Sequence, residues 1–366
     1  MTMPIRVLHV VIAGEVGGAE RMLRDLASRP EQSGAAHSIA LITPNPALTE
    51  LFARTARLRL RDRSRAREGP LSFLWSSLGP RDVAWLADVA RREEAQIVQL
   101  HTFASQVAGT RAALRLGLPV LRTEHSTRVY DDPSCWPFSR WSLRRAQSAV
   151  FVSEHVRRAA LSKDPTIFPR ARVVHNGVDT EHFAFAPPAP PRGPFTFALV
   201  GRLERRKGVD RAIEALRHVP ETRLEIVGDG AERSRLETLV VENGLEARVR
   251  FHGALDDPRP ILLRAHAALC ASREEGLGIA NLEAMAMGRP VVASPVGGVP
   301  EIVQDAVTGL LAHDMSVASL ALRMHDAVKH RDKTLALGAA ARKFVLDRCS
   351  IDAMCRAYGR VYAELL

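Results

Sequence analysis

The 366-residue chain has few cysteines, few aromatic residues and no long apolar run. Its four cysteines are scattered and form no Cys-x-x-Cys pair, so we expect neither a disulfide framework nor a zinc site, and a reducing compartment fits. No apolar stretch approaches the ~18 residues that span a bilayer, and the first 16 residues resemble a strand rather than a signal peptide. Hydrophobic residues at 46 % and charged residues at 25 % exclude a disordered chain.

Several motifs that would assign a chemistry are also missing. No Asp-x-Asp occurs, which removes the usual pair of carboxylates for a metal-bound diphosphate, so we expect no metal and no cofactor. The turn after the first strand does not fit Gly-x-Gly-x-x-Gly, and the second strand ends at Thr43-Pro44 without an acid for a ribose. A nicotinamide dinucleotide site is therefore disfavoured. No Ser-His-Asp or metal-ligand spacing stands out.

Acidic residues are too few to balance the basic ones, and the formal net charge is +10. Residues 1–183 hold 26 basic and 18 acidic residues, a net charge of +8, whereas the remainder has a net charge of +2. Seven arginines fall between Arg54 and Arg67, with apolar residues on either side. This patch suits an anionic membrane surface, although a solvated basic face or loop would look the same. No recognition motif for nucleic acid accompanies it.

The chain alternates short apolar runs with helical patterns, which predicts parallel sheets covered by helices. The predicted strands are residues 5–12, 38–43, 97–100, 120–123, 149–152, 172–174, 196–200, 223–227, 249–252, 267–270 and 290–293. Residues 183–194 contain five prolines in twelve positions and are predicted to be a linker. The fold class is thus α/β, with two similar halves, residues 1–182 and 195–350. Ligands of such sheets bind outside the carboxyl ends of strands, so we expect a site in a cleft where the halves face each other.

Two glycine-containing turns follow predicted strands and suggest anion binding. Gly17 and Gly18 precede a helix whose free N–H groups could hold an anion, although a plain strand-to-helix turn is equally compatible. In the second half, Gly201 and Gly208 bracket Arg202 and Lys207 directly after a strand. An arginine fork and a lysine charge at this position can hold a diphosphate; alternatively, they are ordinary surface charges. The turn with Gly228 repeats this pattern one strand later and is more often structural.

Residues 272–288 are the most informative stretch. Gly276 and Gly278 form a loop before a predicted helix, residues 279–287, that is apolar nearly all round and therefore buried. Glu283 interrupts this helix, and a buried carboxylate needs an N–H group, a cation or ligand hydroxyls. Together with Glu275 it could grip the hydroxyls of a sugar and a ribose; alternatively, it is a first-turn acid that favours the helix dipole.

Two histidines end strands of the first half. His125 follows the strand at 120–123 and would point toward the ligand edge of the sheet. His101 ends the preceding strand and is a second candidate. A lone histidine is more often structural, so neither assigns a chemistry by itself.

At these residues the sequence resembles the family 4 retaining glycosyltransferases of the GT-B fold over nearly its whole length. The resemblance rests on several motifs: Gly17-Gly-Ala-Glu20, the His125 segment, His175-Asn-Gly-Val-Asp179, Gly201-Arg202 with Lys207-Gly208, Gly228-Asp-Gly230, and the pair Glu275/Glu283 followed by Gly288-Arg-Pro and Gly297-Gly-Val-Pro-Glu301. It implies two facing Rossmann-like domains, with a final helix, residues 351–366, that crosses back to complete the first domain.

The resemblance also implies roles for single residues. Arg202 and Lys207 would neutralise the donor diphosphate without a metal, Glu283 would bind the ribose hydroxyls, and Glu275 would hold the donor sugar. His125 would contact that sugar. The implied donor-binding set is Gly17, Gly18, Arg202, Lys207, Gly228, Leu255, Glu275, Gly276, Leu277, Gly278 and Glu283, and the implied catalytic set is His125, Arg202, Lys207 and Glu275.

The function expected from this resemblance is transfer of a sugar, with retention, from a UDP- or GDP-linked donor to a lipid-linked or cell-surface polysaccharide acceptor. The basic first half favours an enzyme that is peripheral on the inner face of the cytoplasmic membrane. A soluble transferase acting on a small metabolite and a nucleotide-binding module without turnover are the alternatives. The sequence decides neither the donor base and sugar nor the acceptor.

Overall fold

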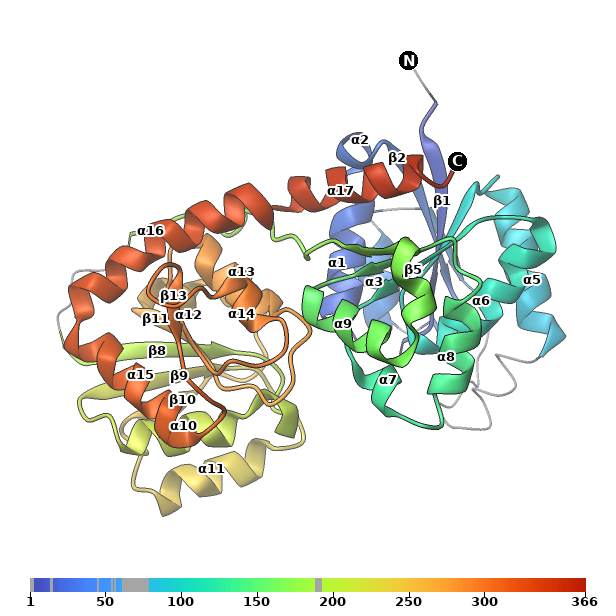
Figure 1. Ribbon diagram of the computed structural model, residues 1–366. Helices are drawn as coiled ribbons and strands as arrows, with labels where there is room; N and C mark the ends of the chain where they lie inside the picture. Colours follow the sequence, from blue (N-terminus) through green and yellow to red (C-terminus); the bar gives the residue numbers. More distant parts are fainter. Residues whose placement is uncertain are drawn as a thin grey trace. The chain divides into compact units, whose positions relative to one another are not determined.

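Figure 1 shows a computed structural model of the protein, which describes residues 3–13, 16–44, 46–53, 55, 57–60, 79–187 and 193–366. The chain forms two compact units. The first comprises Met1–Gly177 together with Ile351–Leu366, and the second comprises Val178–Ser350. The chain therefore leaves the first unit, builds the second, and returns to the first.

The first unit contains a parallel sheet, which has seven strands within the described residues and the order β3-β2-β1-β4-β5-β6-β7. The strands are β1 (Ile5–Val11), β2 (Ala35–Leu41), β3 (Arg57–Leu60), β4 (Ile97–Leu100), β5 (Val120–Glu124), β6 (Ser148–Phe151) and β7 (Ala171–Val173). The central strands are buried on both faces, which explains their apolar sequences. The six strands predicted in this half are confirmed, with ends that move by up to three residues.

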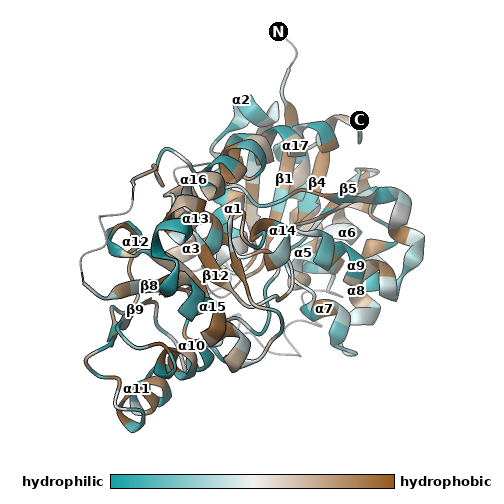
Figure 2. Ribbon diagram, turned by 60° about the vertical axis from the view of Figure 1, so that its left-hand side comes forward, coloured by the Kyte–Doolittle hydropathy of each residue, from teal (hydrophilic) through white to brown (hydrophobic). Residues whose placement is uncertain are grey.

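Helices with one apolar face cover this sheet. They are α1 (Gly18–Ala27), α2 (Pro30–Ser33), α3 (Pro46–Ala53), α5 (Pro80–Arg92), α6 (Phe103–Leu116), α7 (Arg128–Asp131), α8 (Trp136–Leu143), α9 (Glu154–Lys163) and α17 (Ile351–Ala363), with a 3₁₀ turn η1 at Pro165–Arg170. In Figure 2 strands such as β1 and β12 are brown, whereas the helices around them carry teal stretches. Burial of the apolar faces against the strands is what holds such layers together.

Strand β3 was not predicted, because its sequence lies inside the arginine-rich segment. Arg57 and Arg59 stand on this edge strand and pair with the buried Glu93, at 3.9 Å from Nη1 and 2.6 Å from Nε. Ser38 Oγ of the neighbouring strand donates to the same carboxylate at 2.8 Å. Residues 57–60 are therefore not a loop but a charged sheet edge, a common protection against edge-to-edge pairing. Most of the Arg54–Arg67 patch lies outside the described residues.

The second unit contains another parallel sheet, with six strands among the described residues in the order β10-β9-β8-β11-β12-β13. The strands are β8 (Phe195–Val200), β9 (Thr222–Val227), β10 (Val249–Phe251), β11 (Ala267–Cys270), β12 (Val291–Ala293) and β13 (Gly309–Leu311). The helices are α10 (Val209–Arg217), α11 (Arg233–Glu242), α12 (Arg259–Arg264), α13 (Ile279–Ala286), α14 (Val299–Ile302), α15 (Val317–Lys329) and α16 (Arg331–Arg348), with a 3₁₀ turn η2 at Arg205–Lys207. The five predicted strands are confirmed, and β13 is additional.

The first residues of the predicted proline-rich linker are bound to the second unit. The amide of Ala186 donates to the Met287 carbonyl at 3.3 Å, and Arg289 Nη1 donates to the Ala186 carbonyl at 2.6 Å. The ring of Phe185 covers Gly288 so closely that a Cβ there would lie 2.4 Å from it. Residues 183–187 are thus fixed to this unit, and residues 188–192 lie outside the described part of the chain.

Helix α17 belongs to the first unit, as the resemblance implies. Its apolar face packs into a core cluster with strands β1 and β4 and helix α1. Polar groups also fix its position, since Tyr362 Oη donates to Gln99 Oε1 at 2.7 Å and Gln99 Nε2 donates to Thr123 Oγ1 at 2.9 Å. Because the groups are buried, a shift of the helix along the sheet would break the bond of Tyr362 to Gln99 at a cost of ~1–3 kcal/mol, and the bond to Thr123 holds the Gln99 amide in place to accept it.

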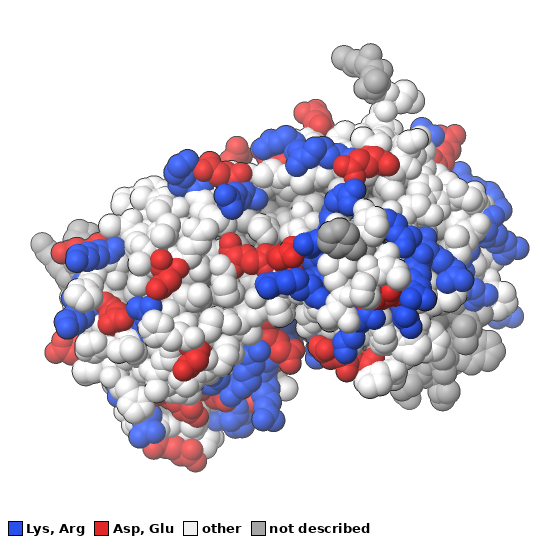
Figure 3. Space-filling model, viewed as in Figure 1, with Lys and Arg blue, Asp and Glu red and all other residues white. Residues whose placement is uncertain are grey.

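Among the helices of the described residues, none has both the length and the apolar character needed to cross a membrane. On the face shown in Figure 3, Lys and Arg side chains spread over much of the first unit. This agrees with the net charge of +8 that residues 1–183 carry.

Candidate active site

Two loops of the second unit meet at the carboxyl edge of its sheet. Strand β8 ends at Val200 and runs into the loop with η2, and strand β11 ends at Cys270 and runs into the loop before α13. Because these strands are parallel neighbours, their ends lie at the same edge. A pocket opens there, lined by Leu199, Val200, Lys207, Leu269, Cys270, Ala271, Ser272, Glu275, Gly278, Ala280 and Asn281.

Lys207 and Glu275, both predicted from the sequence, form an ion pair in this pocket. Lys207 Nζ lies 2.7 Å from Glu275 Oε2, and the side chains are 19 % and 11 % exposed. Ser272 Oγ donates to the same oxygen at 3.2 Å. The sequence did not indicate that these two residues pair, nor that Ser272 takes part. The pair keeps a cation and a carboxylate in the lining of the pocket, where each can exchange its partner for a ligand group.

Arg202 stands at the outer side of the same loop. Its Nη1 lies 3.1 Å from Glu204 Oε1, and the other carboxylate oxygen of Glu204 pairs with Arg206 Nε. The Arg202 side chain is 43 % exposed. A partner this exposed holds a guanidinium weakly, since surface ion pairs contribute ~0–1 kcal/mol. The pair with Glu204 therefore opposes a turn of Arg202 toward a phosphate only weakly.

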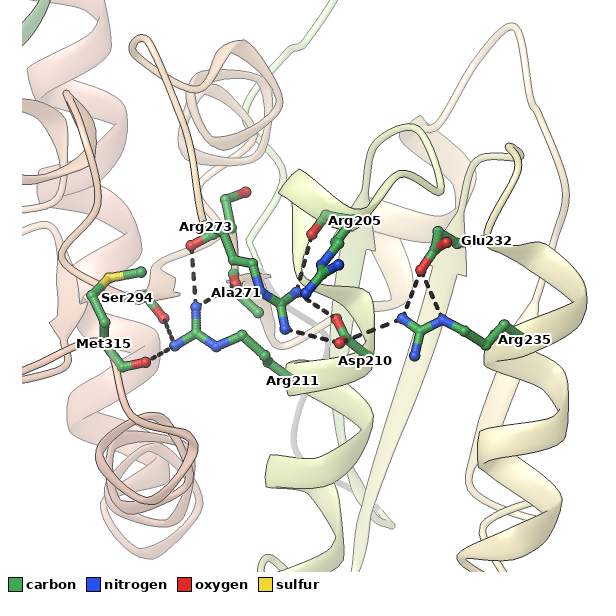
Figure 4. Close-up of polar contacts among 10 residues, drawn as sticks. Arg205, Asp210, Arg211, Glu232, Arg235, Ala271, Arg273, Ser294 and Met315 are labelled. Carbon is green, nitrogen blue, oxygen red and sulfur yellow. Dashed lines mark hydrogen bonds and ion pairs between the residues drawn. The ribbon is translucent and has the colours of Figure 1, made fainter. Parts of the chain in front are cut away.

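A network of hydrogen bonds and ion pairs around Arg273 and Asp210 connects the two loops, as Figure 4 shows. The backbone amide of Arg273 donates to the Arg206 carbonyl at 2.7 Å, and its guanidinium pairs with Asp210 at 2.7 Å and 2.9 Å. Arg235 approaches the same carboxylate at 3.5 Å. Burial opposes ionisation of Asp210, but the hydrogen bond and charge of Arg273 hold its pKa below the ordinary value. The network fixes the distance between the loops that carry Lys207 and Glu275.

Arg211 holds the second loop from behind. It is buried, and its Nη1 donates to the carbonyls of Ala271 and Ser272 at 3.0 Å and 3.3 Å. Its Nη2 donates to the Met315 carbonyl (Figure 4). The carbonyls of Ala271 and Ser272 would otherwise be buried without this donor. Arg211 and Arg273 are site-building residues that the sequence did not reveal, because Arg211 binds mainly backbone carbonyls and the carboxylate partner of Arg273, Asp210, lies 63 positions earlier in the chain.

Close backbone packing explains two of the glycines. Gly208 has φ +62°, and a Cβ there would lie 2.0 Å from the Ala271 carbonyl oxygen. Gly228 has φ +140°, and a Cβ there would lie 1.9 Å from the Gly201 carbonyl oxygen. Both positions require glycine for the fold of the loops. For Gly228 this is the structural explanation that the sequence left open, and its contact with a donor stays a prediction.

Helix α13 is buried, as predicted, and Glu283 is one of its buried residues. The helix begins after Gly278, which has φ +97°, and Glu283 is 9 % exposed. Asn281 of the same helix is also buried and lines the pocket. Of the other predicted donor contacts, Gly276 is half-buried, Leu277 is buried and Leu255 is 39 % exposed. The pocket therefore contains Lys207, Glu275 and Gly278 of the predicted set, and Leu255 stands apart on an exposed loop.

In the first unit, Gly17 and Gly18 begin helix α1. Gly17 is the N-terminal cap, and its amide donates to Glu20 Oε2 at 2.9 Å. This bond fits the plain strand-to-helix turn, and anion binding at the helix start stays a prediction. Gly14 and Glu15 lie outside the described residues.

His125 follows β5 on a rigid segment. Arg122 and Glu124 form a fully buried ion pair at 2.6 Å, and Tyr130 Oη donates to the other oxygen of Glu124 at 2.7 Å. His125 Nε2 is buried without a hydrogen-bond partner in the described structure. Burial lowers the pKa of His125 to about 4, although Glu124 opposes this, so the ring is neutral near pH 7. The imidazole is thus neutral and its Nε2 lacks a partner in the described structure, and contact of His125 with a ligand stays a prediction.

Family models match both units. The model "Glycosyltransferase Family 4" matches residues 16–182, and the model "Glycosyl transferases group 1" matches residues 181–344. The α-maltose-1-phosphate synthase of Mycolicibacterium smegmatis is 31 % identical over 299 residues, which cover 72 % of this chain and 77 % of that protein. The chain belongs to glycosyltransferase family 4. A GDP-mannose-dependent α-(1-6)-phosphatidylinositol monomannoside mannosyltransferase from the same organism is 32 % identical, over 70 % of this chain and 75 % of its own length.

Solved structures confirm that this glycosyltransferase has the GT-B fold. HepE of Anabaena in complex with UDP matches with a TM-score of 0.85 at 21 % identity, over 99 % of this chain and all of HepE. The sucrose-phosphate synthase of Thermosynechococcus elongatus matches with a TM-score of 0.85 at 22 % identity, over 99 % of each chain. The predicted family, fold and enzyme class are therefore confirmed, while the roles of single residues in this glycosyltransferase stay predictions.

Proposed function

We propose that this glycosyltransferase transfers a sugar, with retention of the anomeric configuration, from a nucleoside diphosphate donor to a lipid-linked or cell-surface polysaccharide acceptor. The observation that carries the proposal is the pair of Lys207 and Glu275, 2.7 Å apart, in the lining of the pocket beside helix α13. It combines a cation for phosphate with a carboxylate for sugar hydroxyls at the edge where ligands of parallel sheets bind. HepE, which has the same fold, was solved with UDP, with UDP and glucose, and with UDP-glucose.

The proposed chemistry rests on charge placed before the reaction begins. Lys207 and Arg202 would stabilise the diphosphate as it leaves, which is the step where negative charge develops. Glu275 and the backbone N–H groups of residues 277 and 278 would hold the donor sugar, and Glu283 would bind the ribose hydroxyls. His125 would contact the sugar from the first unit. In a same-face attack the leaving phosphate accepts the proton of the acceptor hydroxyl, so no carboxylate nucleophile is needed.

We propose that no metal ion takes part, because the two cations take the role that a metal would have at the diphosphate. Turnover after exhaustive treatment with EDTA is the test. Unchanged turnover supports the proposal, whereas loss of turnover that Mn²⁺ or Mg²⁺ restores would show that a metal holds the donor.

The donor is identified most directly by a thermal-shift screen of the purified protein. A ligand that binds the native state stabilises it and so raises the midpoint of unfolding. At 100 times its Kd, the ligand adds ~2.7 kcal/mol to the free energy of unfolding. The screen uses UDP, GDP, UDP-glucose and GDP-mannose, whose names occur among the relatives and related structures. No shift with any of them would contradict the proposed donor class. Binding without transfer or donor hydrolysis would instead support a nucleotide-binding module.

A lipid-linked acceptor at the inner face of the cytoplasmic membrane is the acceptor that we propose. It is supported by the net charge of +8 in residues 1–183 and by the relative that acts on phosphatidylinositol monomannoside. The alternative, a soluble transferase for a small metabolite, is favoured by the α-maltose-1-phosphate synthase relative. Co-sedimentation with vesicles of anionic and of neutral lipid distinguishes the two. Binding to anionic vesicles that weakens with salt supports the membrane enzyme, and no binding to either supports the soluble one.

A further inference from the structure

Three histidines form a diagonal across one face of the first unit's sheet. His37 of β2 pairs in register with Val7 of β1, so it stands two residues below His9. His9 pairs with Gln99 of β4, so His101 stands two residues above it, directly after that strand. Side chains two residues apart point to the same face of a sheet. The diagonal therefore rises from the amino edge of the sheet to its carboxyl edge.

The histidines are joined by an unbroken chain of hydrogen bonds. His101 Nε2 lies 2.9 Å from His9 Nδ1, and His9 Nε2 lies 2.8 Å from His37 Nδ1. His37 Nε2 lies 3.0 Å from the hydroxyl of Ser33, at the end of α2. All four residues are buried. Burial also lowers the pKa of each histidine, so the rings are neutral near pH 7.

Neutrality makes the three rings share one tautomer. A neutral imidazole has one N–H group, so His9 and His37 must each accept one bond of the chain and donate the other, and His101, at the end of the chain, takes the tautomer that His9 requires. Either all three carry the hydrogen on Nε2, or all three carry it on Nδ1. Ser33 Oγ lies 3.2 Å and 3.3 Å from the carbonyls of Arg29 and Pro30, to which it can donate only if it accepts from His37. The Nδ1–H alternative would also leave a buried N–H of His101 without an acceptor, at ~1–3 kcal/mol.

The favoured arrangement therefore ends in an open acceptor. His101 Nδ1 is buried and has no hydrogen-bond partner in the described structure. The His125 ring stacks beside it, with 5.9 Å between the centroids, and His125 Nε2 is likewise unpartnered in the described structure. Thr102 Oγ1 accepts from the Ile12 amide at 3.2 Å, which holds this corner next to the end of β1. An unprotonated ring nitrogen accepts a hydrogen bond and so matches a hydroxyl rather than an ionised phosphate.

We propose that His101 is a second sugar-binding histidine beside His125, which accepts a hydrogen bond from a sugar hydroxyl at Nδ1, and that Ser33, His37 and His9 fix the tautomer that leaves Nδ1 open. The inference rests on the proposed function, because the sugar is that of the donor or the acceptor. The alternative is a purely structural role, in which the hydrogen bonds among the histidines only support the packing of α17 where Tyr362 lies against His37. A structural role would need the hydrogen bonds among the histidines, but it would not need an unpartnered Nδ1 on His101.

The tautomers are read directly by nuclear magnetic resonance of the full chain labelled with ¹⁵N-histidine, with signals assigned by single substitutions. Long-range ¹H–¹⁵N correlations distinguish Nε2–H from Nδ1–H rings. At pH 7.5, without ligand, we expect His9, His37 and His101 all to carry Nε2–H. If any of the three carries Nδ1–H, the chain does not present an open acceptor and the proposal is overturned.

Two substitutions at His101 distinguish the role of its hydrogen bond to His9 from the role of its unpartnered Nδ1. In His101→Gln the amide reaches the position of Nε2 and can donate to His9, but nothing replaces Nδ1. In His101→Asn the amide oxygen replaces Nδ1, but the link to His9 is lost. We therefore expect His101→Gln to melt close to the wild type and to bind free nucleotide as the wild type does, while its affinity for the sugar falls. His101→Asn should show the opposite, lower stability with the sugar affinity largely kept.

Two experiments decide whether the hydroxyl belongs to the donor or to the acceptor. For the donor, calorimetry compares the affinity for UDP with that for UDP-glucose, and the affinity for GDP with that for GDP-mannose. For the acceptor, methyl α-glucoside or methyl α-mannoside is added in the presence of saturating nucleotide while the His101 Nδ1 signal is followed. Loss of one neutral hydrogen bond corresponds to a roughly threefold to tenfold weaker sugar contact in His101→Gln. If affinity changes less than twofold and the Nδ1 signal moves in neither arm, the proposal is wrong. If the wild type binds no nucleotide, the proposed function fails, and the glycoside titration without nucleotide still decides the role of His101.

Discussion

The ammonium group of Lys207 lies 2.7 Å from the carboxylate of Glu275, so the two proposed contacts of the donor neutralise each other before a donor is present. In the proposed complex, a nucleotide sugar would replace this pair by two others, lysine with diphosphate and carboxylate with sugar hydroxyls. The pair is only partly exposed, which limits screening by water. It therefore holds both groups in the pocket lining and leaves neither charge unpaired.

Removal of either diphosphate cation should slow the reaction more than it affects folding. We expect Lys207→Ala and Arg202→Ala each to lower kcat by ~10²–10³-fold, the usual cost of one preorganised group at developing charge. Arg205→Ala is the control, because it removes a neighbouring exposed cation. Only the backbone carbonyl of Arg205 bonds to Arg273, so this variant should retain most of the turnover. Steady-state kinetics with the identified donor measures all three. Near-normal turnover in both of the first two variants would refute the diphosphate assignment.

Glu283→Gln should weaken the binding of nucleotide while the fold is preserved, because the amide keeps the volume of the side chain in α13 but loses the charge that accepts from ribose hydroxyls. Hydrogen bonds to a charged group are worth ~1.5–3 kcal/mol, which corresponds to roughly tenfold to a hundredfold in Kd. Calorimetric titration with the free nucleotide provides the measurement, and Glu237→Gln on the exposed face of α11 is the control. An unchanged affinity would show that Glu283 does not contact the nucleotide.

Gly208→Ala should be far more damaging than Gly244→Ala, although the two glycines share the same backbone conformation. Their φ angles are +62° and +63°, but a Cβ on Gly208 would lie 2.0 Å from the Ala271 carbonyl, whereas nothing lies within 4 Å of a Cβ on Gly244. We expect a loss of ~1–2 kcal/mol at Gly244 from the left-handed conformation alone, and at least about 3 kcal/mol at Gly208. Urea denaturation compares them. Equal losses would mean that the loops at residues 208 and 271 are not packed as described.

Arg211→Met should destabilise the second unit by ~2–4 kcal/mol, because the buried carbonyls of Ala271 and Ser272 lose their donor. Arg217→Met, at the exposed end of the same helix, should stay within ~0.5 kcal/mol of the wild type. Chemical denaturation followed by circular dichroism measures both. If Arg211→Met is as stable as the control, the guanidinium does not support the Glu275 loop.

Acidification should destabilise the first unit between about pH 6.5 and pH 4. Burial lowers the pKa of His37 and His125 from the ordinary 6.5 to about 4, so in this range the unfolded chain binds more protons than the folded one. The stabilisation is complete above pH 6.5 and decreases as the pH falls toward 4. His37→Gln removes one of these groups, so its stability should fall less steeply over the same range. Parallel slopes for the wild type and this variant, from urea titrations at several pH values, would contradict the buried neutral histidine.

Most strands could be predicted because parallel strands buried on both faces are short, continuous apolar runs. Strand β3 could not, since it is an edge strand whose alternate arginines pair with Glu93 and give no apolar signal. Strand β13 escaped because Gly309–Leu311 is three residues long and begins with glycine. In both cases the strand is specified by its neighbour in the sheet rather than by its own composition.

The candidate site was predicted as a set of residues but not as a set of contacts. The sequence indicated Lys207 and Glu275 separately, and only the packing of two loops brings them together. His9 and His37 were missed because a single histidine in an apolar strand gives no sign of a partner on the next strand. The parallel register would have revealed it, since placing His37 opposite Val7 aligns the two rings on one face. Arg211 was missed because its partners are carbonyls, which every residue has.

The order of the units along the chain has a consequence for protein synthesis. Val178–Ser350 forms an uninterrupted unit, whereas the first unit needs Ile351–Leu366, which the ribosome makes after it. The unit translated first is therefore completed last. Until α17 arrives, the apolar surface that it covers, including Val7 and Met22, is open to solvent and to chaperones. Because folding of the first unit must await the last helix, nascent chains stalled before residue 351 should be targets for degradation, even when their second unit is already native.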